Sequence, residues 1–302
     1  MTVVYPRKLQ NALSARDILT QVVRDREVHM ITLNRYRFSE QRSCRDLTNL
    51  VESLDGQPPE LVRDLSHHIA DEARHAMWLT DLLTDLGVSV GRPPGVSYIE
   101  EFDRLVDYEF AETQDKDSTV ISAIAAINVA EKRGCEYFAA HIHALKQQPQ
   151  TEEVVKVRET IERIFPEEAA HVRWGNRWLA QLARKSPAHR EQVETAKRRY
   201  AAIEQAAFSA GMDITLGAEL RRVSRLLDVA ETLPLWQRPQ YLMNRLPQAL
   251  FAPELQMTRV DVAQRAWKRD PQAFMEKFIP MFLNGISQFN KSEKPQQATS
   301  KA

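Results

Sequence analysis

The 302-residue sequence contains little cysteine, little glycine and no excess of either charge. Only two cysteines occur, which cannot form a disulfide framework, and nine glycines are too few for a fibrous or low-complexity protein. Lysine and arginine together number 41, as do aspartate and glutamate, so no overall field favours nucleic acid or an anionic membrane surface. We expect a small-molecule ligand or a protein partner, and neither nucleic acid nor membrane.

Long apolar runs are also absent. The longest apolar stretch, around Ala123 to Ala130, is far too short to span a bilayer, and the first ten residues lack the apolar segment of a signal peptide. These features predict a cytoplasmic protein. With 43% hydrophobic residues, the chain can bury one large core or one core with a helical extension.

Apolar residues recur at helical spacing over most of the chain. The pattern predicts long helices at about 19–54, 60–86, 118–146 and 151–185, with a short helix near 98–113 in the connection between the second and the third. We expect Gly87 to end the second helix, Ser118 and Thr151 to cap the third and fourth, and Pro166 to bend the fourth.

This order predicts an all-α fold, a four-helix bundle with one long crossover at 19–187, of the ferritin-like type. An N-terminal extension (1–18) would precede it, and a helical extension (188–290) and a disordered tail (291–302) would follow. The extension could serve as a homodimer face, a docking surface for a reductase or a lid over the substrate.

Two Glu-x-x-His pairs, Glu72 with His75 and Glu168 with His171, place both of their side chains on one helical face. The other two long helices each offer a glutamate in phase with apolar residues, Glu40 and Glu131. Glu136 is the alternative candidate to Glu131 on the same helix, but the residues that share a helical face with Glu136 are more polar, so Glu131 is preferred. These six residues are the donor set of a dinuclear site, and four carboxylates with two imidazoles suit iron, with manganese as a substitute.

The two halves of this set repeat each other. Glu40 is followed by Cys44 and the block DEARHAMW (71–78), and Glu131 is followed by Cys135 and the block EEAAHVRW (167–174). We expect both cysteines to be buried thiols. The repeat indicates a duplicated helix pair, which is the symmetry that a site with two metal ions requires.

The block DEARH resembles the Asp-Glu-x-Arg-His signature of the oxygen-activating ferritin-like diiron carboxylate proteins, such as the bacterial multicomponent monooxygenases. The resemblance implies that Asp71 and Glu167 accept the N–H groups of the ligating histidines on the opposite helices, with Arg74 beside them. His68 lies on the ligand face, and its role is open: diiron N-oxygenases have an additional histidine ligand, but on the last ligand helix, where this chain has Ile164.

The resemblance implies an enzyme: a non-haem diiron oxygenase or oxidase that uses dioxygen to hydroxylate, N-oxygenate or otherwise oxidise a small organic substrate. Nothing in the sequence resembles a flavin or nicotinamide site, so electrons would come from a separate reductase or ferredoxin. Two alternatives stay open. One is a ferroxidase or peroxide-scavenging protein without an organic substrate, and the other is a non-catalytic bundle subunit of an oxygenase complex.

Overall fold

The computed structural model of the chain describes residues 15–93, 98–99, 102–103, 106, 116–211, 226–227 and 229–249, with short pieces between 264 and 276. Every regular element in these residues is a helix, which confirms the all-α class for this part of the chain. The helix expected near 98–113 and the tail at 291–302 lie largely or wholly outside the described residues.

The first predicted helix is interrupted. The structure has α1 (Ala15–Val22) and α2 (Arg26–Ser53) in place of one helix over 19–54. Asp25 lies between them with an extended backbone, and its Oδ1 accepts a hydrogen bond from the backbone N–H of Val28 at 3.1 Å. An aspartate in this position caps a new helix, so the prediction of a continuous helix was wrong here.

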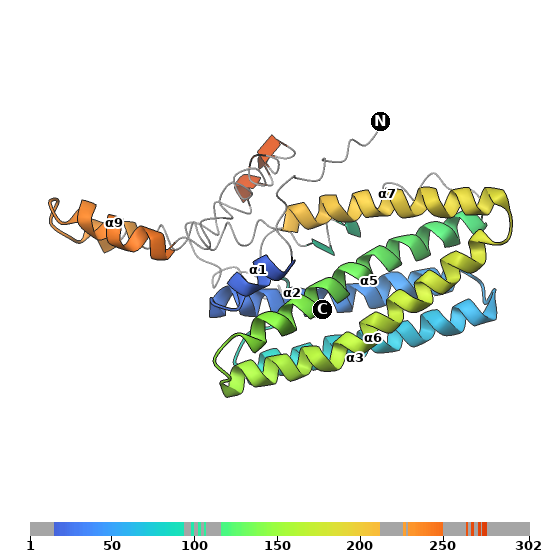
Figure 1. The fold of residues 1–302 in the computed structure, drawn as a ribbon, viewed down its shortest axis with the longest axis horizontal. Coiled ribbons are helices and arrows are strands. Elements are labelled where there is room, and N and C mark those ends of the chain that lie inside the picture. Colours follow the sequence, from blue (N-terminus) through green and yellow to red (C-terminus); the bar gives the residue numbers. More distant parts are fainter. Residues whose placement is uncertain are drawn as a thin grey trace, which may run out of the picture. The chain divides into compact units, whose positions relative to one another are not determined.

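Four long helices form two antiparallel pairs (Figure 1). Helix α2 packs along α3 (Pro59–Asp85), and α5 (Lys116–Lys146) packs along α6 (Glu152–Ala183). Short loops join the helices of each pair, and α3 also contacts α6. The connection from α3 to α5 is long, as predicted.

Local signals in the sequence explain several helix ends. Gly87, with φ of +70°, follows α3, and the backbone N–H groups of Gly87 and Val88 bond back to Thr84 and Leu83 at 2.9 Å. This is the Schellman arrangement expected of a glycine after a helix. Thr151 caps α6 as predicted, whereas α5 begins at Lys116, so Ser118 lies inside the helix and is not its cap. Helix α6 continues through Pro166.

A fifth long helix, α7 (Pro187–Gly211), packs on α5 and α6. It buries Tyr200 and Ile203, and its buried Glu204 bonds to Arg133 of α5 at 2.5 Å. The compact unit that contains α1 to α7 comprises Met1–Val90 and Ser97–Gly211. A second unit, Gly91–Val96 with Met212–Ala302, contains α9 (Arg238–Ala249).

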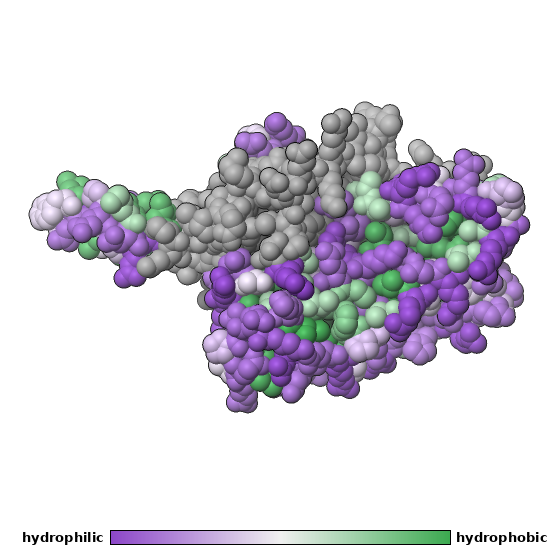
Figure 2. Space-filling model, viewed as in Figure 1, coloured by the Kyte–Doolittle hydropathy of each residue, from purple (hydrophilic) through white to green (hydrophobic). Residues whose placement is uncertain are grey.

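The first unit has two separate apolar clusters. One includes Leu54, Leu61 and Ile121, and the other includes Leu33, Leu83 and Phe138. Residues with polar side chains occupy the middle of the four helices, between the positions that form these clusters. The face in Figure 2 is mainly hydrophilic, with apolar residues gathered where α5 lies. No helix among the described residues is long and apolar enough to cross a membrane.

Candidate metal centre

All six predicted ligands are buried in the middle of the four long helices. Each helix contributes to the set: α2 provides Glu40, α3 provides Glu72 and His75, α5 provides Glu131, and α6 provides Glu168 and His171. None of the six is more than 8% exposed. Glu40 and His171, which are 131 positions apart in the sequence, therefore lie in the same buried cluster.

One group of four comprises Glu40, Glu72, His75 and Glu168. Its ligand atoms all lie within 4.8 Å of one another. Nδ1 of His75 is 3.0 Å from Glu168 Oε1 and 3.3 Å from Glu40 Oε2. This nitrogen faces the carboxylates and is the donor that a bound ion would use.

The second group comprises His68, Glu72, Glu131 and His171, also within 4.8 Å. Nδ1 of His171 lies 3.4 Å from Glu72 Oε1 and 3.6 Å from Glu131 Oε2. Nε2 of His68 lies 3.3 Å from carboxylate oxygens of both Glu72 and Glu131. The structure thus places His68 among the predicted ligands of this group.

Glu72 belongs to both groups. Its Oε1 is 3.4 Å from His171 Nδ1 and 3.9 Å from His75 Nδ1, so one carboxylate lies between the two histidines. A carboxylate has two oxygens with several lone pairs and can bind two cations at once. The two groups could therefore hold two neighbouring metal ions that share Glu72.

Unsatisfied polar atoms at this place fit bound cations. Glu72 Oε1, Glu168 Oε1, His171 Nδ1 and both ring nitrogens of His68 are buried without a hydrogen-bond partner. Buried polar groups in proteins are almost always paired, and an unpaired one costs about 1–3 kcal/mol. Buried carboxylates and imidazoles that lie this close together could instead hold metal ions.

The pKa values of the buried carboxylates and of His75 also fit a cluster that could bind cations. Burial raises the pKa of Glu40 to about 8, and the charge of Glu72 adds to the effect. Burial and the neighbouring glutamates raise the pKa of Glu168 well above its ordinary value. Burial opposes the charged form of His75, but a hydrogen bond and charge interaction with Glu40 raise its pKa to about 9. The metal-free cluster therefore retains protons at neutral pH, which bound cations would displace.

A polar layer outside the ligands orients both histidines. Nε2 of His75 lies 2.8 Å from Glu167 Oε2, and Nε2 of His171 lies 3.1 Å from Asp71 Oδ2. Arg74 donates to both of these carboxylates, at 2.9 Å in the case of Glu167. Such contacts fix the tautomer and leave Nδ1 facing the ligand cluster. Asp71 and Glu167 thus each contact a histidine of the opposite helix, and Arg74 lies beside both carboxylates.

Helix α5 offers two glutamates, and only one of them faces the cluster. Glu131 is buried, whereas Glu136 is exposed and bonds to Arg133 at 2.8 Å. Gly134 lies opposite Glu168, and a Cβ atom at Gly134 would come within 3.3 Å of Glu168 Oε2. A glycine here leaves room for the carboxylate of Glu168.

The two cysteines lie one turn after Glu40 and Glu131 and are only half-buried. They are free thiols, and burial together with the nearby carboxylates raises the pKa of each to about 11. Neither thiol belongs to the two groups of described residues that could hold a metal ion.

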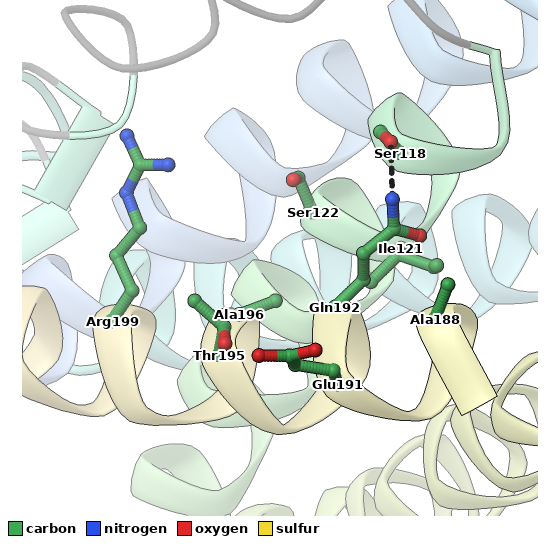
Figure 3. Close-up of a pocket in the computed structure, with 9 residues that line it drawn as sticks. All are labelled: Ser118, Ile121, Ser122, Ala188, Glu191, Gln192, Thr195, Ala196 and Arg199. Atoms are coloured by element: carbon green, nitrogen blue, oxygen red, sulfur yellow. Dashed lines mark hydrogen bonds between the residues drawn. The ribbon is translucent and has the colours of Figure 1, made fainter.

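A pocket of about 460 Å³ between α5 and α7 is a second candidate site (Figure 3). Its walls carry Ser118, Glu191, Gln192 and Arg199, and Gln192 donates to Ser118 Oγ at 3.3 Å. No candidate metal ligand lines it. It is therefore less favoured as a catalytic site than the buried cluster.

Comparison with known families identifies the chain at the level of its family. A family profile described as "Protein of unknown function (DUF455)" matches residues 27–224. The chain belongs to the DUF455 family. No curated protein and no solved structure matched it. The DUF455 match includes His68, all six predicted ligands and α7.

One buried polar pair in this DUF455 protein was not expected from its sequence. Nε2 of His29 and Nε2 of His141 lie 2.8 Å apart, so one ring donates to the other. His29 precedes Glu40 by 11 positions, about three helical turns, and this spacing could have indicated that it shares the ligand face. Among the described residues, the pair lies outside the two groups that could hold a metal ion.

Proposed function

We propose that this DUF455 protein is a ferritin-like diiron protein that uses dioxygen to oxidise a small organic molecule. The observation that carries the proposal is the position of Glu72, which belongs to two buried groups of carboxylates and imidazoles at once. A protein that binds one structural ion has no need of a second, adjoining set of donors.

The helix arrangement supports the ferritin-like assignment. Two antiparallel pairs, α2 with α3 and α5 with α6, are joined by one long crossover, and each pair contributes one Glu-x-x-His motif. In ferritin-like dinuclear carboxylate proteins, two helices each provide a glutamate and the other two each provide a Glu-x-x-His motif. Glu40, Glu131 and the two motifs correspond to that division.

The donor set supports iron. Four carboxylates supply hard oxygen donors and the histidines supply borderline nitrogen donors, a combination that suits iron or manganese. Structural zinc sites usually have four ligands dominated by cysteine and histidine. The described residues of this site provide no thiolate ligand.

The residues of the chain would perform three tasks. Iron, when bound, supplies the ability to activate dioxygen, chemistry that protein side chains lack. Glu167 and Asp71 hold the histidines in the required tautomer, and Arg74 donates to both of these carboxylates and holds them in place. The apolar clusters at either end of the site exclude water. Electrons for repeated turnover would come from a separate reductase or ferredoxin.

Oxygen uptake tests this proposal. Protein loaded anaerobically with ferrous ion should consume dioxygen repeatedly when an external reductant and an oxidisable substrate are supplied, and Glu168→Ala should abolish the uptake. The Glu136→Ala variant is the matched control, because Glu136 is a glutamate on α5 that lies outside the cluster.

Other results would contradict the oxygenase assignment. One round of uptake that leaves ferric protein, with no dependence on substrate, would indicate a ferroxidase. An iron-loaded protein that is inert to dioxygen would indicate a non-catalytic subunit.

A further inference from the structure

A pocket of about 300 Å³ lies between α2 and α5 and extends to one of the candidate ligands. Its walls include Leu47 and Leu50 from α2, Ala123 and Ala126 from α5, and Phe102 from the connection between α3 and α5. Glu131 also lines it. The pocket therefore connects the surface of the first unit with the buried cluster.

Small side chains on α5 account for the hollow. Ala123, Ala126 and Ala130 follow the spacing of one helical face and all line the pocket. Alanine methyl groups do not fill the space between two helices, and α2 and α5 belong to different helix pairs. The larger apolar side chains Leu47, Leu50 and Phe102 line the same space.

Charges at the pocket compensate one another. Arg45 pairs with Asp46 at 2.7 Å and lies 3.9 Å from Asp103, which is also bonded to Arg42. These two positive and two negative side chains compensate one another. The remaining charged residue of the lining, Glu131, is itself paired with His68 at 3.3 Å, so the pocket offers no unpaired charge to attract an ion. A charged occupant would also lose its hydration against walls that are mainly apolar, and that loss is costly without a partner.

The pocket reaches only one of the two metal groups. Glu131 lies 3.3 Å from His68 and 3.6 Å from His171, and it belongs to the group that contains both histidines. Glu40, His75 and Glu168 do not line the pocket. A molecule in the pocket would therefore approach the ion on the His68 side.

We propose that this pocket binds the organic substrate, and that the substrate is a neutral, mainly apolar molecule of about one or two rings. The size follows from the volume, since a cavity of about 150 Å³ accommodates benzene and this pocket is about twice as large. The proposal rests on the proposed function, because it assigns a substrate to the same metal centre.

Calorimetry with three indoles tests the pocket. Indole is neutral, indole-3-acetate is an anion and tryptamine is a cation, so the series varies charge on one ring system. With metal-free protein, where the anion cannot bind a metal ion, indole should bind at least tenfold more tightly than either charged analogue. The same titrations are repeated after anaerobic loading with ferrous ion.

Two substitutions by phenylalanine locate the binding. Ala126→Phe fills the pocket at a position that is 5% exposed, and it should weaken indole binding at least tenfold. Ala139→Phe adds the same side chain at an exposed position of α5 and should leave the affinity within twofold. Ser43→Phe, at a half-buried pocket position on α2, replaces Ala126→Phe if that variant does not fold.

Three results would overturn the proposed substrate pocket. These are the absence of indole binding, indole binding with an affinity that neither Ala126→Phe nor Ser43→Phe changes, and a charged analogue that binds more tightly than indole. Iron content is measured on the same samples. If indole binds as expected but the protein takes up no iron, the metal centre is wrong while the pocket stands. If iron binds and indole does not, the pocket is wrong while the metal centre stands.

Discussion

At the scale of single residues, His68 has the most distinctive environment. Its Nδ1 is buried without a hydrogen-bond partner, and its Nε2 lies 3.3 Å from carboxylate oxygens of both Glu72 and Glu131. Its ring lies 3.7 Å from the ring of His171 between centroids, and Nδ1 of His171 lies 3.4 Å and 3.6 Å from the same two carboxylates. We infer that His68 is a ligand of the ion on the His171 side.

Substitution of His68 tests this role. His68→Ala should reduce iron uptake from about two ions per chain to about one, because the Glu40–His75 group retains all of its donors. His143→Ala removes an exposed histidine from α5 and serves as the control. Anaerobic titration with ferrous ion, followed by metal analysis, measures the change. Two firmly bound irons in His68→Ala would exclude His68 as a ligand.

The sequence alone could not decide the role of His68. Helical phase places it on the ligand face, but the resemblance to N-oxygenases puts the additional histidine at the position of Ile164. In the structure, Ile164 is buried in an apolar cluster, whereas His68 lies within 3.3 Å of Glu72 and Glu131. The decisive information is the distance between side chains of α3 and α5, which spacing along one helix does not contain.

At the scale of elements, the contact between α5 and α6 depends on Gly175. A Cβ atom at this position would lie 2.7 Å from Nδ2 of Asn128, which is buried and donates to the carbonyl of Val172. The missing side chain lets α6 approach α5 closely at the level of the site. Helix propensity alone would favour alanine at this position by about 1 kcal/mol.

A double-mutant cycle tests this packing. Gly175→Ala should lower the free energy of unfolding by about 1–3 kcal/mol, because the added methyl group displaces Asn128. Asn128→Ala removes the obstructing side chain, so the two substitutions together should cost less than the sum of their separate effects. Urea denaturation of the four proteins measures the coupling. A Gly175→Ala variant as stable as the wild type would contradict the close contact.

Helix existence and most helix ends were predictable from local signals, because those signals act within a few residues. Gly87 ends α3 and Thr151 caps α6 as expected. The break before α2 was missed because Asp25 follows residues that keep the helical pattern, and the pattern itself has no gap. Whether Asp25 continues a helix or caps a new one depends on how α1 and α2 pack, which is a tertiary effect.

At the scale of the whole molecule, the buried pair His29 and His141 links stability to pH. Burial lowers the pKa of His29 to about 4 and that of His141 well below its ordinary value. Between pH 6.5 and 4 these two histidines therefore bind more protons in the unfolded chain than in the folded one. The contribution of the pair to stability should fall as the pH decreases through this window, by about 1.4 kcal/mol per pH unit for each histidine.

The His29→Gln variant isolates this effect, because glutamine cannot titrate but can still donate a hydrogen bond to His141. The loss of unfolding free energy between pH 7 and pH 4.5 should be smaller in the variant by about 2 kcal/mol. Urea denaturation of the metal-free proteins at both pH values provides the comparison. Equal losses in the two proteins would show that His29 does not titrate in this window.

The features that the sequence did not predict depend on contacts between residues far apart in the chain. The sequence could indicate that the six candidate ligands come together, because their helices repeat the same spacing, with Glu40 and Glu131 each followed by a Glu-x-x-His pair. No such repeat marks the contact of His29 with His141, which are 112 residues apart, or the pocket between α2 and α5. Both features arise only when the two helix pairs come together.

The most direct test of the central claim is the amount of iron that each chain binds, with and without Glu72. Anaerobic titration should give about two ferrous ions per chain for the wild type and for Glu136→Ala. Glu72→Ala should bind neither ion firmly, because both groups lose the ligand they share. If Glu72→Ala binds as much iron as the wild type, or if the wild type binds no more than a trace, the protein does not contain the proposed dinuclear centre.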